Sequence, residues 1–161
     1  MARAVLLTGG NLGPVARNLE EARRRIGERV GTVVAASSMR DSEAWGFESD
    51  DRFLNQVLVV ETALEPEQVL DACQRIESEM GRVRTPGAGY SSRTMDIDIL
   101  FYENRVISTE RLVVPHPRME QRDFVLAPLE EVLPAFVHPV SGKTVRQLRE
   151  ELKRRGSGQS V

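Results

Sequence analysis

Two stretches of the chain carry apolar residues at three- and four-residue spacing, the pattern of helices that bury one face. The first follows Pro14, which suits the first position of a helix, and ends at Gly31. The second begins at Pro66 and ends at Gly81, where a glycine can cap a helix C-terminus. Their inward positions are Val15, Leu19, Ala22, Ile26 and Val30 in the first helix and Val69, Leu70, Cys73, Ile76 and Met80 in the second.

Runs rich in β-branched and apolar residues predict strands between and around these helices. The runs span residues 4–8, 32–39, 53–64 and 95–102. With the helices they give the order β-α-β-β-α-β, which is typical of a ferredoxin-like α+β fold with helices packed on a mainly antiparallel sheet. No internal repeat or second domain is visible, so a single domain over residues 1–161 is predicted.

Three segments lack clear periodicity. Residues 41–52 are acidic, and residues 82–94 combine glycines, a proline and three arginines. Both are predicted to be loops, and loops of this length are uncommon in compact domains unless they carry a function. Residues 106–117 are predicted to be irregular or to form short strands.

The C-terminal third is predicted to be helical. Leucines and a valine over residues 126–133 mark a short helix, and Thr144 with Gln147 resembles a capping box that opens the last helix. His138 lies in a turn rich in proline and glycine, so we expect it at the surface. The tail 156–161 is rich in glycine and serine and is predicted to be frayed.

Composition narrows the class of protein. The 161 residues include 22 basic and 24 acidic side chains, a net charge of −2, which weakens a nucleic-acid-binding interpretation. One cysteine and two histidines cannot assemble a Cys/His zinc cluster. Apolar runs fall short of the ~18 residues of a membrane span, and no export signal is present, so we expect a cytoplasmic protein with neither a membrane nor a nucleic-acid partner.

The most suggestive acidic pair is Asp96 and Asp98. On a strand, residues two apart share a face and lie roughly 6.6 Å apart along it. Ile97 and Ile99 would then face the core while both carboxylates project together. Such carboxylates can hold Mg²⁺, which takes oxygen ligands and keeps positions for water or phosphate. The alternative is a solvated strand face, but unpaired charge inside an apolar strand is costly.

The loop that precedes these aspartates carries Arg82, Arg84 and Arg93, and arginine binds phosphate oxygens through paired hydrogen bonds. His116, held between two prolines, could also bond a phosphate oxygen. The alternatives are surface ion pairs for the arginines and a backbone-bonded ring for the histidine. No Walker loop is present, so nucleotide phosphates would depend on side chains and metal.

A flat heterocycle needs a ring to stack on and an amide to read its edge. Phe53 and Asn55 share one strand face and meet both needs. Trp45, Tyr90 and Phe124 are further candidate rings, although each could equally belong to a core.

In this order, these motifs resemble the 6-hydroxymethyl-7,8-dihydropterin pyrophosphokinase family. The resemblance runs from Leu7 to about Leu148, and its most specific stretch is Arg-Thr-Met-Asp-Ile-Asp-Ile-Leu at residues 93–100. Supporting stretches lie at residues 53–55, 74–77, 81–84, 111–117 and 122–129. The chain departs from the family pattern where members often carry Trp-Gly-Pro, since it has Tyr90, Ser91 and Ser92.

The resemblance implies a three-layer α-β-α ferredoxin-like fold, with ATP and a reduced pterin as substrates, two Mg²⁺ ions and AMP as a product. It implies that Asp96 and Asp98 bind the metal and that they act in catalysis with Arg82 and Arg93. The implied ATP-binding residues are Gln74, Glu77, Arg82, Arg84, Arg93, Ile99, Arg111, His116 and Arg122. The implied pterin-binding residues are Ser42, Glu43, Trp45, Phe53, Asn55, Tyr90 and Phe124.

Three other functions stay open at this point. A nucleic-acid-binding ferredoxin-like module would use the rings for base stacking and would not need the aspartate pair. A nucleotidyl or simple phosphoryl transferase would release pyrophosphate or ADP instead of AMP. An inactive relative would lack the charged motif residues that this chain retains. A monomer is favoured among oligomeric states.

Overall fold

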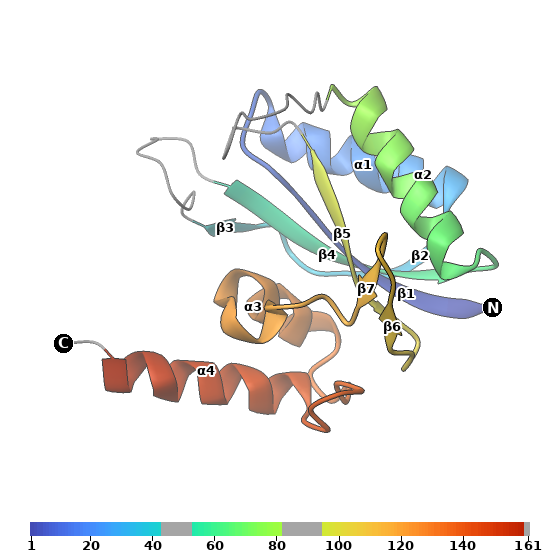
Figure 1. Cartoon of the computed structure of the whole chain (residues 1–161). Helices are drawn as coiled ribbons and strands as arrows, with labels where there is room; N and C mark the ends of the chain where they lie inside the picture. Colours follow the sequence, from blue (N-terminus) through green and yellow to red (C-terminus); the bar gives the residue numbers. More distant parts are fainter. Residues whose placement is uncertain (43–52, 82–94, 160–161) are drawn as a thin grey trace.

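The computed structural model describes residues 1–42, 53–81 and 95–159. Strands and helices alternate through the first two thirds of the chain, and helices dominate the last third (Figure 1). The elements are β1 (Ala2–Gly10), α1 (Val15–Arg29), β2 (Thr32–Ala36), β3 (Arg40–Ser42), β4 (Phe53–Thr62), α2 (Pro66–Glu79), β5 (Asp96–Tyr102), β6 (Ile107–Ser108), β7 (Val113–Val114), the 3₁₀ helix η1 (Met119–Gln121), α3 (Asp123–Val132) and α4 (Val145–Gln159).

The main sheet has the strand order β2-β4-β1-β5, and every pair in it is antiparallel. β3 pairs with β4 beyond the end of β2. Helices α1 and α2 cover one face of this sheet, and α3 and α4 lie on the other (Figure 1). The predicted ferredoxin-like α+β fold with three layers is confirmed.

Each face of the sheet has its own hydrophobic core. Ile97 and Ile99 of β5 pack with the apolar stripes of α1 and α2, as predicted. Leu100 and Phe101 both pack on the α3 and α4 side, because a register shift between β1 and β5 interrupts the alternation of side chains. The two cores leave β5 buried on both faces along most of its length.

Local signals fix the ends of the helices as the sequence predicts. Thr144 and Gln147 form the capping box of α4, with the Gln147 N–H donating to Thr144 Oγ1 at 3.1 Å and the Thr144 N–H donating to Gln147 Oε1 at 2.9 Å. Gly81 follows α2 with φ 94°, a conformation that glycine adopts without steric cost. The backbone of α4 stays helical to Gln159, into the segment that its glycines and serines predict to be frayed.

Two sequence predictions near the third strand are wrong. The strand predicted over residues 32–39 ends at Ala36, because Ser37 uses both its N–H and its Oγ to bond to the backbone of Val57, each at 2.9 Å. The loop predicted from residue 41 begins instead as strand β3, which pairs Arg40 with Asn55. A strand of three residues is too short to show alternation in the sequence.

His138 is also not at the surface, since its side chain is almost fully buried. Its Nδ1 accepts the N–H groups of Val140 and Ser141 at 3.2 Å, and its Nε2 lies 3.3 Å from a carboxylate oxygen of Glu120. Burial lowers the pKa of His138, while the charge of Glu120 opposes that shift. The turn is polar in sequence but folds over Phe101, whose ring meets the imidazole edge-on.

Cys73 is fully buried, as predicted, and burial raises the pKa of its thiol to about 12. It is therefore a core residue and not a nucleophile. No helix within the described residues has both the length and the apolar character needed to span a bilayer.

Candidate active site

Three neighbouring strands bring the predicted metal and pterin residues into one row. Gly9 of β1 pairs with Asn55 of β4 on one side and with Asp96 of β5 on the other. Leu7, two residues before Gly9, pairs with Asp98 and packs in the core beneath α3 and α4. Because paired residues of antiparallel strands share a face, Asn55, Asp96 and Asp98 all lie on the α3 side of the sheet.

Gly9 makes this row possible. A Cβ atom at Gly9 would stand 2.4 Å from Asn55 Oδ1 and 3.4 Å from the carbonyl oxygen of Leu54. The buried amide of Asn55 therefore lies against the backbone of β1, where only glycine leaves room for it. Between Asn55 on β4 and Asp96 on β5, the middle strand β1 therefore contributes only backbone atoms at Gly9.

The two aspartates suit a hard cation. Both carboxylates are half-buried and lie on the same side of β5, with Ile97 between them turned into the core, as predicted. Oxygen donors are the ligands that Mg²⁺ prefers. Within the described ranges no group of three or more His, Cys, Asp or Glu side chains is arranged for a metal, so a cation here would need further oxygens from water or a substrate.

His116 stands near this pair. Its backbone N–H donates to the carbonyl of Leu100 in β5 at 3.0 Å, which ties the segment after β7 to the aspartate strand. Its Nδ1 bonds to the carbonyl of Pro117 at 2.7 Å, so Nδ1 carries the hydrogen and the neutral ring keeps Nε2 as an acceptor. The pKa of His116 is lowered overall, chiefly by burial and also by the charge of Arg122, while the bond to Pro117 and the charge of Asp96 oppose that shift.

The predicted pterin-binding residues within the described ranges lie on β3, β4 and α3. The Arg122 guanidinium lies 5.7 Å from the centre of the Phe124 ring. Phe124, half-buried, borders a hollow of about 180 Å³ whose other lining residues are Arg40, Asp41, Asp123, Ala127 and Pro128. Phe53, at the start of β4, pairs with Ser42 of β3 and lies on the same face as Asn55.

Glu131 links the two elements that border this hollow, α3 and the segment of β3. Its carboxylate accepts the N–H of Ser38 at 3.1 Å, the hydroxyl of Ser38 at 2.9 Å and the guanidinium of Arg40 at 3.1 Å. Burial raises its pKa, but the bonds to Ser38 and Arg40 outweigh that effect and lower it overall. Glu131 was not predicted as a site residue, because its bonds join segments more than 90 residues apart in the sequence.

The remaining predicted ATP residues of the described chain lie on the opposite side of β5. Gln74 is exposed on α2, and Arg111 is ion-paired with Asp71 of the same helix. Glu77 and Ile99 are both buried, and Ile99 belongs to the core under α1 and α2. These residues therefore lie on the α2 side of the edge strand β5, and the two aspartates lie on its α3 side.

Six predicted site residues lie outside the described ranges. They are Glu43, Trp45, Arg82, Arg84, Tyr90 and Arg93. Their roles stay predictions.

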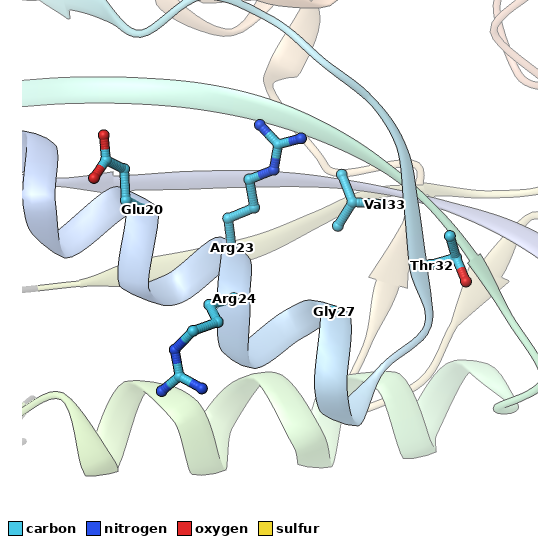
Figure 2. A pocket seen from close by; sticks show the side chains of 6 residues that line it. All are labelled: Glu20, Arg23, Arg24, Gly27, Thr32 and Val33. Atoms are coloured by element: carbon cyan, nitrogen blue, oxygen red, sulfur yellow. The ribbon is translucent and has the colours of Figure 1, made fainter.

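A larger hollow, about 430 Å³, lies elsewhere, between α1 and β2 (Figure 2). Its lining residues are Glu20, Arg23, Arg24, Gly27, Thr32 and Val33. Figure 2 shows Arg23 and Arg24 pointing in different directions from α1, and Arg24 is bonded to Glu21 and Glu28 of its own helix. None of the residues predicted for catalysis or binding lines this hollow.

The described site has carboxylates on the edge strand β5, a histidine bonded to that strand, and an amide and a ring on β4. Such a set suits a transferase that brings phosphate groups to a flat acceptor on a ferredoxin-like scaffold. The model of the 7,8-dihydro-6-hydroxymethylpterin-pyrophosphokinase (HPPK) family matches residues 5–134, and the chain belongs to that family.

Named relatives are similar in sequence to this chain over most of their own length. A 2-amino-4-hydroxy-6-hydroxymethyldihydropteridine pyrophosphokinase of Methylorubrum extorquens is 40% identical over 153 residues, which are 94% of each chain. The protein of the same name from Aquifex aeolicus is 36% identical over 151 residues, 94% of this chain and 92% of its own. That from Synechocystis is 39% identical over 150 residues, 92% of this chain and 75% of its own.

Solved structures agree in fold. A Plasmodium falciparum HPPK-DHPS structure superposes with a TM-score of 0.79 over 99% of this chain at 17% identity. A second HPPK-DHPS structure, solved in complex with substrates, has a TM-score of 0.77 at 15% identity. The chain spans less than half of either, 46% and 45% respectively, and at these identities the likeness concerns the fold alone.

Proposed function

We propose that this chain transfers the pyrophosphoryl group of ATP to the hydroxymethyl group of 6-hydroxymethyl-7,8-dihydropterin, in folate synthesis, with Mg²⁺ bound by Asp96 and Asp98. Family membership supports the reaction. The observation that carries the proposal is the row across β4, β1 and β5, in which an amide suited to the pterin lies two strands from a carboxylate suited to the metal.

The donor set fits Mg²⁺, and we propose two ions, the usual number in phosphoryl chemistry. When bound, Mg²⁺ would neutralise charge on the triphosphate. Asp96 and Asp98 would hold it where the sheet presents both carboxylates to the α3 side.

Further roles are proposed for the amide, the two rings and three arginines, of which Arg82 and Arg93 lie outside the described residues. Asn55 would read the edge of the pterin, and Phe53 and Phe124 would flank its ring. This would orient the hydroxymethyl oxygen toward the row's other end. There the oxygen would form a bond to the β-phosphorus and lose its proton to solvent, while the bond from that phosphorus to the α,β-bridging oxygen breaks and AMP leaves with that oxygen. Arg82, Arg93 and Arg122 would balance the charge that develops on the phosphates.

We place His116 at the nucleotide with a defined tautomer. Since its Nδ1–H is bonded to Pro117, only Nε2 can meet ATP. A neutral ring would accept a hydrogen bond there, and a protonated ring would donate one to a phosphate oxygen. Exposed Gln74 and Arg111 would approach the nucleotide from the α2 side.

The proposal also includes a single domain over residues 1–161 that acts as a cytoplasmic monomer. Both faces of the sheet are covered by helices of this chain, which supports the monomer. Sedimentation analysis at assay concentration would test the monomer.

The reaction is tested by its nucleotide products. Chromatography after incubation with Mg·ATP should show AMP that depends on the pterin and disappears when Mg²⁺ is chelated. ADP or pyrophosphate as the product would overturn the reaction while leaving a nucleotide site.

A further inference from the structure

The Asp96–Asp98 segment is anchored from the side that has no neighbouring strand. Among the described strands, β5 is the last in the sheet and has β1 on one side only. The N–H of Ile97 donates instead to a carboxylate oxygen of Glu77, at 2.7 Å. Glu77 lies in the last turns of α2, and its side chain is 4% exposed.

This bond acts on the backbone between the two metal-suited residues. The N–H of Ile97 belongs to the peptide that joins Asp96 to Ile97, and Asp98 directly follows Ile97. On the other side of β5, pairing with Gly9 and Thr8 of β1 holds the same residues. The backbone between the carboxylates is therefore fixed from both edges, which sets the directions of both side chains.

The chemistry of the bond fits a permanent anchor. Burying a carboxylate is costly unless it is bonded, and an N–H donated to a charged oxygen makes a short, strong hydrogen bond. Ile97, whose N–H donates to this carboxylate, packs in the core between β5 and α2. Glu77 reaches β5 from the α2 side, whereas the aspartates lie on the α3 side, so Glu77 is not placed as a third metal ligand in the described structure.

We infer that Glu77 is a positioning residue, which holds the Asp96–Ile97 peptide so that Asp96 and Asp98 bind Mg²⁺ together. The inference rests on the proposed function, because it takes the aspartates as the metal site. The sequence predicts that Glu77 contacts ATP directly. Under this inference Glu77 instead affects nucleotide binding indirectly, by holding strand β5.

The test compares Glu77→Gln, which keeps an oxygen acceptor of the same reach, with Glu77→Leu, which keeps the volume and removes the acceptor. Glu79→Leu is the matched control, since Glu79 is exposed on the same helix and bonds to Arg25 and Arg29 of α1. Two quantities are measured in each folded protein: hydrogen exchange at the Ile97 amide, and calorimetric affinity for α,β-methylene-ATP across a Mg²⁺ titration.

Loss of an outer-shell partner of metal ligands typically lowers metal affinity ~10- to 100-fold. We expect Glu77→Leu to raise the half-saturating Mg²⁺ concentration by at least ~10-fold and to speed Ile97 exchange. Glu77→Gln should stay within ~3-fold of the parent protein, and Glu79→Leu should leave the Mg²⁺ titration unchanged while lowering Tm.

Two results would overturn the inference. One is an unchanged Mg²⁺ titration for folded Glu77→Leu. The other is a loss in Glu77→Gln as large as in Glu77→Leu, which would mean that the charge, and not the acceptor, matters. If Glu77→Leu does not fold, Glu77→Ala, which also removes the acceptor, takes its place in both measurements. These binding readouts are separate from AMP formation, so failure of the proposed reaction is recognised independently.

Discussion

Gly9→Ala tests the row on which the proposed function depends. The added Cβ would stand 2.4 Å from Asn55 Oδ1, and ordinary contact begins at 3.4 Å, so the amide must retreat by about 1 Å. Asn55 is buried and has little room to move. Overpacking of this kind costs about 1–3 kcal/mol, and each kcal/mol lowers Tm by about 2–4 °C in a chain of this size.

The effect on binding should exceed the effect on stability. An amide displaced by about 1 Å no longer reads the pterin edge, and misplacement on that scale can cost ~10²-fold in function. We expect the Kd for 6-hydroxymethyl-7,8-dihydropterin, measured by fluorescence titration, to rise ~10- to 100-fold, with Mg²⁺-nucleotide affinity changed by less than ~3-fold.

Two other glycines supply the controls. At Gly31 a Cβ would meet the backbone oxygen of Glu61 at 2.0 Å, so Gly31→Ala should lower Tm at least as much without affecting pterin affinity. At Gly27, on α1, nothing lies within 4 Å, and Gly27→Ala should stabilise the protein by about 0.5–1 kcal/mol. If Gly9→Ala lowers Tm as Gly31→Ala does and leaves pterin affinity intact, Asn55 does not read the pterin from this position.

Three further outcomes are expected. Asp96→Asn should lower Mg²⁺-dependent turnover by at least ~100-fold while pterin affinity stays within a few-fold, and full turnover would remove Asp96 from the metal site. Glu131→Ala releases Ser38 and Arg40 from α3 and should raise the pterin KM by ~3- to 10-fold with an unchanged ATP KM, partly restored in Glu131→Gln. Burial lowers the pKa of His138, so the unfolded chain binds more protons near pH 6 and the free energy of unfolding should fall as pH drops below about 6.5. Urea unfolding at pH 7.5 and 5.5 should show a smaller difference in His138→Gln than in the parent protein, and an equal difference would assign the pH dependence to other groups.

Much of the fold is visible in the sequence because it follows from periodicity. The stripes of α1 and α2 and the apolar run of β5 each show their burial pattern in a single segment. The capping box at Thr144 likewise involves residues three apart. A strand of three residues such as β3 is too short to show alternation, and the burial of His138 depends on contacts with segments far away in the sequence, so neither was predicted.

The same distinction applies to the candidate site, where some residues could be predicted from the sequence and others depend on contacts between separate elements. Asp96, Asp98 and Asn55 could be singled out because their residue types and spacing are unusual for buried strands. Gly9 and Glu77 left weaker signals that could have been used: a glycine inside a strand often marks a close backbone approach, and an acid four residues after Cys73 falls on the apolar stripe of its helix. Their roles become clear only from the contacts they make across the sheet and from α2 to β5.

The placement of the site in the sheet has a consequence for how it can fail. The row from Asn55 through Gly9 to Asp96 is held by the register of three strands, and a slip of one residue would turn a strand's side chains to the opposite face. Loss of pairing along β1 would therefore remove the proposed pterin reader and the proposed metal site together. Changes to single contacts such as Glu131 or Glu77 should instead affect one substrate at a time. Separate measurement of pterin and Mg²⁺-nucleotide affinity would thus distinguish damage to the sheet from damage to the elements packed on it.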